Sequence, residues 1–352
     1  MTKKWTGYLG TYTKESSQGV YKFTLDAEEQ KITKITAVAE LDNPTYITVS
    51  NNNKYLYAVS KEEEKGGVTA FTIDQETGAL NRLNSLAQAG SPPCHVSVKS
   101  DGSIVLTANY HTKQIISYLT NPDGSLKQVA DIAEHTGSGP HERQEKPHIH
   151  YAGFSPDEKF VLAIDLGSDQ ITSYAIDAQG KLEKKHTFKA PAGSGPRHLV
   201  FAPNGAYAYC MTELSSEVFT LEYNRKTGEF KQLDTIKAIP KSHQTVNDGS
   251  AIHITRDGKF VYAANRGHNS IAVFKVDELT HKLEFIEWVD TEGDWPRDFM
   301  LLPDENESLL IASNQKSGTL TVFERDQETG KLTVKQTDVK APEVVCVKFL
   351  RN

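Results

Sequence analysis

The sequence predicts an all-β fold, a seven-bladed β-propeller, and three observations lead to this fold class. A short apolar strand, a turn of the Ser-Pro-Asp or Asp-Gly type and a second strand rich in Tyr and Ala recur along the chain, most clearly at 154–165, 201–212 and 254–265. The copies return about every fifty residues, a period typical of propeller blades. The last copy is cut short by the C-terminus, and its missing strands are found near the N-terminus.

Each repeat also contains the outer half of a blade. A third strand of alternating pattern follows the second one, as at 171–177, 217–223 and 271–277. A turn of the Thr-Gly or Gln-Gly type then leads to a fourth strand, which would be outermost. We therefore expect four-stranded antiparallel blades.

The two ends of the chain are expected to share one blade. Residues 342–350 supply only an innermost strand, whereas residues 5–13 and 19–25 have the pattern of second and third strands. Pairing the N-terminal strands with the C-terminal strand closes the ring and removes two exposed sheet edges. Residues 1–352 are then used by a single propeller domain.

Composition argues against several classes of partner. The net charge of −7 disfavours a nucleic acid or an anionic membrane, because phosphate surfaces require a basic footprint. Hydrophobic residues form 38% of the chain, which suffices for a packed core, and no apolar run has the length of a leader peptide or a membrane span. We expect a cytoplasmic protein that is a monomer or a weak homo-oligomer.

Cysteines and short motifs add no cofactor to this expectation. Cys94, Cys210 and Cys346 cannot all pair, and each lies in or beside an apolar strand, so we interpret them as reduced thiols. The sequence contains no Gly-rich phosphate loop, no Gly-x-Ser-x-Gly elbow and no zinc-type cysteine pair.

Polar residues cluster at one structural position of the repeats. In a blade, the residue that enters the first strand and the residue that leaves the second lie on the same rim. The entrances hold Tyr46, His95, His148, His150, Arg197, His198, Arg297 and Asp298. The exits hold Asn109, Tyr110, Asp165, Glu213, Asn265, Arg266 and Asn314. For the asparagines, capping of backbone groups explains the position equally well.

The charged members of this set indicate a functional site. Arg197, Glu213 and Arg266 stand where other repeats have smaller or uncharged residues, so bracing of the backbone does not require them. Charges gathered at a narrow mouth are costly unless they pair with one another or bind a ligand. His150 suits proton transfer near neutrality.

A metal site is an alternative for the histidines. His148 and His150 form a His-x-His pair, which on a strand would point both rings to one side, and His141, Glu142 or His198 could add a third ligand. Because His148 belongs to an insertion rather than to the repeat, we predict no metal.

The whole chain resembles the seven-bladed propeller lactonases, a family that includes phosphogluconolactonases and fungal muconate lactonising enzymes. The resemblance rests on YLGTYT at 8–13, on the His-x-x-x-x-Ser-Pro-Asp phrase at 150–157, on GPRHLVFAPNG at 195–205 and on AANRGHNSIAVF at 263–274. It implies a site built from His150, Arg197, Glu213 and Arg266, which also belong to the rim set.

The resemblance implies hydrolysis of 6-phospho-D-glucono-1,5-lactone without a metal or another cofactor. His150 or Glu213 would activate water, and Arg197 or Arg266 would stabilise the oxyanion. The residues expected to bind the substrate and its phosphate are Arg297, His198, His148 and Asn265. The sequence leaves two alternatives: an enzyme that hydrolyses or forms another sugar or carboxylic-acid lactone, and a non-catalytic interaction platform.

Overall fold

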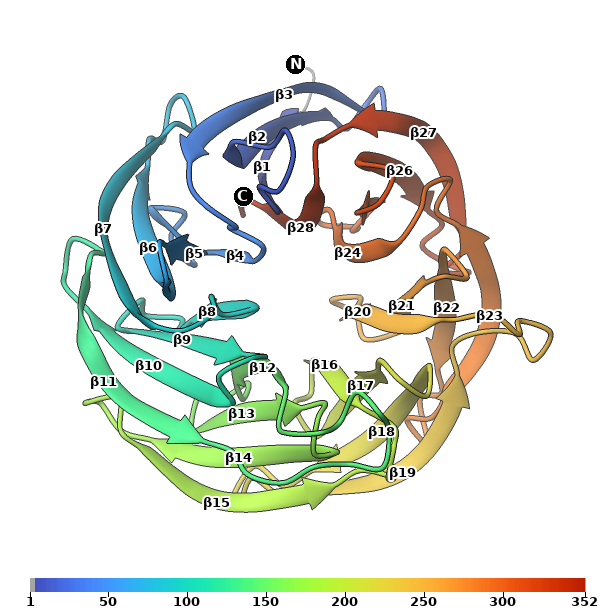
Figure 1. Ribbon diagram of the computed structural model, residues 1–352. Coiled ribbons are helices and arrows are strands. Elements are labelled where there is room, and N and C mark those ends of the chain that lie inside the picture. The colour runs from blue at the N-terminus through green and yellow to red at the C-terminus, as the bar shows by residue number, and fades with distance from the viewer. Residues whose placement is uncertain (1–3, 352) are drawn as a thin grey trace.

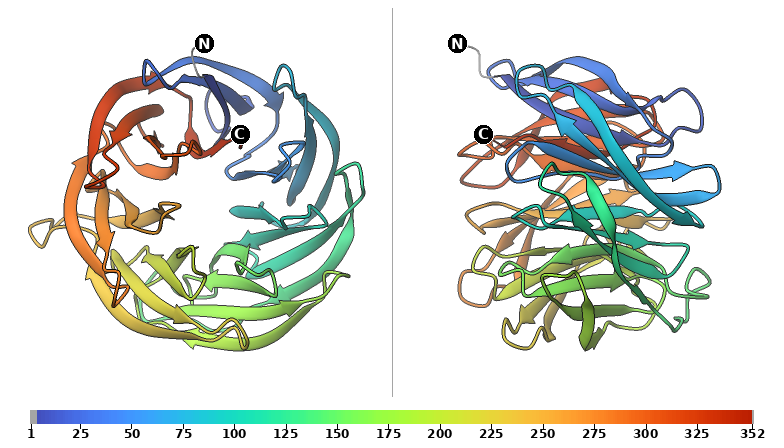
Figure 2. Two further views of the ribbon diagram at one scale, coloured as in Figure 1. Left: turned by 180° about the vertical axis from the view of Figure 1, so that it is seen from behind. Right: turned by 90° about the vertical axis from the view of Figure 1, so that its left-hand side faces the viewer.

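The computed structural model describes residues 4–351 and contains 28 β-strands in seven four-stranded antiparallel sheets. The sheets stand around a central axis like the blades of a propeller (Figure 1). In the view turned by 90°, the ring is seen from its side, and the sheets follow one another from the top of the view to the bottom (Figure 2). The predicted fold class is confirmed. Among the described residues, no helix is long and apolar enough to cross a membrane.

The blades are numbered here from the first complete one. Blade 1 is β4 (Ile47–Val49), β5 (Tyr55–Glu62), β6 (Lys65–Ile73) and β7 (Leu80–Ala89); blade 2 is β8 (His95–Val98), β9 (Ile104–Asn109), β10 (Gln114–Thr120) and β11 (Leu126–Glu134). Blade 3 is β12 (Ile149–Phe154), β13 (Phe160–Asp165), β14 (Gln170–Ile176) and β15 (Leu182–Lys189); blade 4 is β16 (Pro196–Phe201), β17 (Tyr207–Thr212), β18 (Glu217–Tyr223) and β19 (Phe230–Lys237).

The remaining three blades complete the circle. Blade 5 is β20 (Asp248–Ile254), β21 (Phe260–Arg266), β22 (Ser270–Val276) and β23 (Leu283–Asp290); blade 6 is β24 (Pro296–Leu301), β25 (Leu309–Asn314), β26 (Thr319–Arg325) and β27 (Leu332–Lys340). Blade 7 combines β28 (Val344–Phe349) with β1 (Lys4–Thr11), β2 (Gly19–Asp26) and β3 (Lys31–Glu40).

Blade 7 closes the ring as predicted. Its innermost strand is β28, which pairs antiparallel with β1, so that Gly7 lies opposite Phe349 and Gly10 opposite Cys346. The N-terminal and C-terminal segments therefore lie side by side in one sheet (Figure 1). Joining the ends in this way leaves no gap between the first and last repeats.

The core lies between neighbouring blades. One cluster joins Phe260 and Tyr262 of blade 5 to Phe299, Leu310 and Phe323 of blade 6, and similar clusters lie between other pairs of blades. The inner strands are buried on both faces because each sheet is covered by the sheets on either side. Removal of this apolar surface from water is the main stabilising contribution.

The recurrent tyrosine of the second strands links one blade to the next. Tyr57 of β5 donates its hydroxyl hydrogen to the carbonyl oxygen of Gly124 at 2.9 Å, and Tyr262 of β21 donates to Gly330 at 2.7 Å. Both glycines lie in the turn before the outermost strand of the following blade, and both have positive φ, at 82° and 72°. Glycine adopts this conformation without the strain that a side chain would add. The repeated Tyr therefore serves packing between blades.

Candidate active site

A pocket of about 480 Å³ opens at one end of the central axis. The residues lining it are Tyr12, Lys14, Asn43, Thr45, Lys61, Ser91, Pro92, Pro93, Cys94, Tyr110, His111, Arg143, His150, Glu213, Arg266 and Arg297. Many of them stand at first-strand entrances or second-strand exits, so the two positions meet on one rim, as the repeat indicated. The volume is in the range of small-molecule sites.

Local irregularities in the innermost strands aim three site residues at this rim. In β12 the pairing with β13 passes from Ile149 to Tyr151 and omits His150. The pairing of β16 omits Arg197, and that of β24 omits Arg297, in the same way. A bulge of this kind leaves one residue outside the ladder and redirects its side chain.

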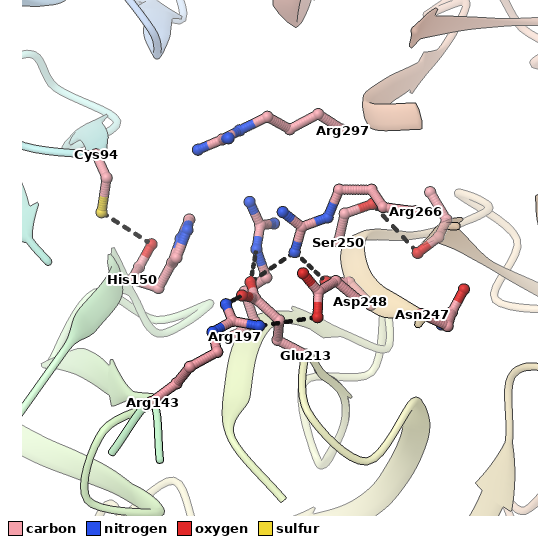
Figure 3. Close-up of polar contacts among 12 residues, drawn as sticks. Cys94, Arg143, His150, Arg197, Glu213, Asn247, Asp248, Ser250, Arg266 and Arg297 are labelled. Atoms are coloured by element: carbon pink, nitrogen blue, oxygen red, sulfur yellow. Dashed lines mark hydrogen bonds and ion pairs between the residues drawn. The ribbon is translucent and has the colours of Figure 1, made fainter. Parts of the chain in front are cut away.

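Glu213 is the centre of a buried charge cluster (Figure 3). Its Oε2 accepts a hydrogen bond from Nε of Arg197 at 3.0 Å and lies 2.6 Å from Nη2 of Arg266. Its Oε1 pairs with Nη2 of Arg143, whose Nη1 donates to Asp248 at 2.9 Å. The side chains of Arg197 and Glu213 are only 2% and 3% exposed, so water screens this cluster weakly.

The cluster keeps Glu213 ionised. Burial alone would raise the pKa of this carboxyl group, but Arg266 and Arg197 outweigh burial and hold the pKa well below its ordinary value. A carboxylate held so firmly by cations is a weak proton acceptor. Glu213 is thus suited to fix the positions of the arginines rather than to take a proton from water.

His150 is held neutral. Burial, and secondly the charge of Arg197, lower the pKa of its imidazole well below the ordinary value. Its buried Nδ1 has no hydrogen-bond partner among residues 4–351. A neutral ring with an unused nitrogen at a pocket wall can accept or deliver a proton.

The arginines also carry unused donors. Within the described part of the chain, Nη1 of Arg197 and Nε of Arg266 are buried without a hydrogen-bond partner. Burial, and then the neighbouring charge of Arg266, lower the pKa of Arg197 to about 10, which still leaves it protonated at neutral pH. Buried unsatisfied donors of this kind are costly unless a ligand oxygen accepts from them.

Three of the predicted binding residues lie outside the pocket lining. Asn265 is fully buried and donates to the carbonyl oxygen of Ala238 at 2.8 Å, which is a bracing role. His198 lies deeper along the channel, where its ring centroid is 5.3 Å from that of His150. His148 stacks on Tyr110 with ring centroids 4.0 Å apart.

The His-x-His pair does not form an extended strand segment. His148 precedes β12, its Nδ1 lies 2.8 Å from the carbonyl oxygen of Tyr110, and the bulge at His150 interrupts the alternation of side chains. Across residues 4–351, no group of three or more His, Cys, Asp or Glu side chains is arranged to hold a metal ion.

Arg143 was missed by the sequence reasoning. It lies in the insertion before β12, which Gln144 anchors by donating to the carbonyl oxygen of Leu166 at 2.7 Å and to Asp169 at 2.8 Å. The one feature of the sequence that could have indicated Arg143 is the insertion itself, because it lengthens the repeat just before His150, where an inner strand enters the rim. Tyr12, Lys14 and Lys61, which also line the pocket, carried no comparable signal.

Cys94 lines the pocket beside His150, but its environment does not favour a nucleophile. Burial raises the pKa of the thiol to about 11, against the smaller opposing effect of Arg197. Since the thiolate is the reactive form, this cysteine is unreactive at neutral pH. Cys210 and Cys346 are buried, and all three cysteines are free.

The fold and the rim together define a class: a seven-bladed propeller with a polar, catalytically equipped pocket at one end of its axis. Residues 6–349 match the family model described as "Lactonase, 7-bladed beta-propeller". The chain therefore belongs to this lactonase family.

Individual relatives cover nearly the whole chain. A 6-phosphogluconolactonase of Bacillus subtilis is 49% identical over 349 residues, which are 99% of each chain. A crystal structure of a protein from Lactobacillus plantarum superposes with a TM-score of 0.95 at 40% identity, covering 99% of this chain and 100% of that one. The periplasmic gluconolactonase of Pseudomonas aeruginosa gives a TM-score of 0.93 at 29% identity, covering 99% of both chains.

Proposed function

We propose that the protein hydrolyses 6-phospho-D-glucono-1,5-lactone to 6-phosphogluconate. The observation that carries the proposal is that a buried neutral imidazole, His150, lines the same pocket as Arg266, and that Arg266 and Arg197, both held by Glu213, each keep an unused donor. The similarity to the Bacillus subtilis 6-phosphogluconolactonase supports the choice of substrate.

The chemistry needs a proton acceptor and a cationic donor. His150 takes a proton from water as the water oxygen attacks the carbonyl carbon of the lactone. Negative charge then develops on the carbonyl oxygen, where the guanidinium of Arg266 or Arg197 stabilises it, an effect worth about 3 to 4 kcal/mol for a preorganised donor. When the bond to the ring oxygen breaks, His150 returns its proton to that oxygen.

The low proton affinity of His150 is compatible with this role. Arg197 opposes the positive charge that forms on the imidazole, but the negative charge on the substrate forms in the same step and offsets it. Glu213 stays ionised throughout and holds Arg197 and Arg266 by its Oε2. Its part is to orient the cations.

The decisive experiment compares His150→Ala and Arg197→Ala with His186→Ala. We expect the first two variants to lose lactone hydrolysis by about 100-fold or more while still melting cooperatively as folded propellers. His186, on outer strand β15, lies outside the pocket and should be replaceable without loss. Wild-type rates in both folded site variants would refute the proposal.

A second candidate substrate is unphosphorylated gluconolactone. The similarity to the Pseudomonas aeruginosa gluconolactonase favours it, since the same fold then serves a lactone without phosphate. Competitive inhibition by 6-phosphogluconate but not by gluconate would support the phosphorylated substrate. The alternative of an interaction platform expects an apolar or aromatic rim, whereas this pocket is lined by His150, Glu213 and several cations.

We also propose that the protein works in the cytoplasm, as a monomer or a weak homo-oligomer. Three free cysteines are typical of a reducing compartment. Cell fractionation tests the location, and light scattering after size exclusion tests the assembly. Recovery of the protein only from an oxidising compartment would contradict the first part, and a stable oligomer at nanomolar concentration the second.

A further inference from the structure

The pocket has two walls with different charge arrangements. Blades 3, 4 and 5 supply the paired wall, defined here as the lining residues Arg143, Glu213 and Arg266 together with Arg197 and Asp248, which pair with them from outside the lining. On the other side, Arg297 comes from blade 6, Lys14 from the segment after β1 of blade 7 and Lys61 from blade 1. These three cations form the open wall.

The cations of the open wall have no acidic partners. Nη1 of Arg297 donates to the amide oxygen of Gln315 at 3.2 Å, and its guanidinium lies 5.4 Å from the ring centroid of Tyr12. Nζ of Lys14 lies 4.5 Å from the same centroid. Within residues 4–351, no carboxylate forms an ion pair with Lys14, Lys61 or Arg297. Figure 3 shows Arg297 extending into the site apart from the Glu213 cluster.

Nearby acidic side chains are engaged elsewhere. Glu62, next to Lys61, pairs with Arg82 at 2.6 Å. Glu343 accepts from the backbone N–H groups of Lys14 at 2.8 Å and Glu15 at 3.0 Å, rather than from a lysine ammonium group. Among the described residues that line the pocket, Glu213 is the only carboxylate, and three arginines already bind it. Among the described residues that line the pocket, the open wall thus presents three cations to the cavity and no carboxylate.

We propose that the open wall is the phosphate subsite, with Lys61 and Lys14 joining Arg297 as specificity determinants; this inference rests on the function proposed above. A phosphate monoester carries a charge of about −1.5 to −2 at neutral pH and three strong acceptor oxygens. Arg297 offers a planar pair of N–H donors and the lysines offer compact charges. Arg197 and Arg266 of the paired wall are bound to Glu213, and their unused donors remain for the lactone group.

The chemistry of the substrate fits two separate walls. The ester carbonyl belongs to the ring, whereas the phosphate extends from it on an arm of one further carbon. A ring placed between the walls can present its carbonyl to His150 and Arg266 while its phosphate reaches toward Arg297. The open wall then distinguishes phosphorylated from unphosphorylated lactones, because an uncharged hydroxymethyl group gains little from it.

The test uses Lys61→Gln and Arg297→Gln, with Lys65→Gln as a matched control. Lys65 lies on β6 in the same hairpin as Lys61, is exposed and does not line the pocket, so its replacement removes one charge without touching the wall. The quantity measured is the ratio of kcat/KM for 6-phosphogluconolactone to that for gluconolactone. We expect each wall variant to lower this ratio at least tenfold, chiefly through KM for the phosphorylated substrate, and the control to keep it.

The outcomes separate this inference from the proposed function. A ratio that stays at the wild-type value in both wall variants overturns the phosphate subsite. A wild-type enzyme that does not hydrolyse the phosphorylated lactone overturns the function instead. In that case calorimetric titration with 6-phosphogluconate and gluconate still decides the subsite: tighter binding of 6-phosphogluconate that is lost in Lys61→Gln supports it, and equal binding of the two overturns it.

Discussion

The paired wall and the open wall of the pocket both contain cationic side chains, but they differ in burial and in whether a carboxylate binds those cations. In the paired wall, Arg197 and Arg266 are buried and share one carboxylate oxygen of Glu213. In the open wall, Lys14 is exposed and Lys61 and Arg297 are partly exposed, and no acid neutralises them. A buried cation requires a permanent acidic partner because it has lost its hydration, whereas a cation in contact with water is stable without one until a ligand binds.

The two walls separate the positioning of catalytic donors from the recognition of the substrate's charge. Glu213 holds the donors for the reacting carbonyl in place before substrate arrives, which is the condition for electrostatic stabilisation of a transition state. The open wall has a net charge to be matched, which favours binding and capture of an anion. Each wall can therefore be disturbed separately.

Glu213→Gln should have the largest effect on stability and activity, because it removes the carboxylate that distinguishes the paired wall from the open wall. Removing one partner of a buried ion pair costs about 3 to 5 kcal/mol of stability, because the remaining charges stay buried. We expect a correspondingly lower free energy of unfolding and loss of hydrolysis of both lactones by about 1000-fold, since the donors lose their position. Urea unfolding and steady-state kinetics measure the two effects.

Glu217→Gln is the matched control for that variant. Glu217 lies on β18 of the same blade and forms an ion pair with Lys237, whose side chain is 54% exposed. The Glu217 side chain is 21% exposed and also accepts a hydrogen bond from Ser215 at 2.7 Å. Because the pair is in contact with water, its loss should cost no more than about 1 kcal/mol, and the variant should turn over like the wild type. Equal behaviour of Glu213→Gln and Glu217→Gln would mean that the buried cluster does not organise the site.

Acidification should lower the free energy of unfolding gradually, with a smaller cost per histidine and pH unit than the loss of Glu213, and it acts on the buried side of the pocket and its channel. Burial lowers the pKa of His95 to about 3, and burial lowers the pKa of His150 and His198 well below 6.5. Below pH 6.5 the unfolded chain therefore binds more protons than the folded one, and the free energy of unfolding falls as the pH falls. Each histidine contributes at most about 1.4 kcal/mol per pH unit.

Thermal unfolding between pH 7.5 and 5 measures this dependence. In His198→Asn the slope of stability against pH should be shallower than in the wild type, because one neutral buried imidazole has been removed. A slope that His198→Asn leaves as steep as before would show that this histidine is protonated in the folded protein.

Added salt should give the smallest effect, a rise in KM for the phosphorylated lactone, because it weakens the exposed charges of the open wall more than the buried charges of the paired wall. The open wall is in contact with solvent, where ions at 0.1 M screen charges beyond about 10 Å. Raising the salt concentration from 0.05 to 0.5 M should increase KM for the phosphorylated lactone by about two- to threefold. Initial-rate measurements on gluconolactone serve as the reference, and an equal increase in its KM would contradict the assignment of the walls.

The fold and much of the rim were predictable because each depends on local pattern. The turn and strand phrases of the repeats define the blades, and blade connectivity then places His150, Arg197, Glu213 and Arg266 at one end of the channel. The blade shared by the two termini was equally predictable, because the last repeat contains only one strand, β28, which pairs with β1.

Other parts depend on contacts that no repeat encodes. Arg143 reaches Glu213 from an insertion held by Gln144, and nothing in a single sequence states where such a loop returns. The bulge at His150 changes the side-chain alternation that the His-x-His spacing suggested. Asn265 has the same rim position as the catalytic candidates, yet its amide is used by the backbone at Ala238.

Ring closure has a consequence for the order in which the protein is made. Tyr12 and Lys14 precede the six complete blades in the sequence and are synthesised before them, but their segment is held by Glu343, whose backbone oxygen accepts from the N–H of Tyr12 at 3.0 Å. Because β28 is synthesised after all the other described strands, β1 remains without its inner neighbour until β28 has left the ribosome. The nascent chain can complete the blades that hold Glu213 and Arg266, but it gains a finished pocket only after β28 has paired with β1.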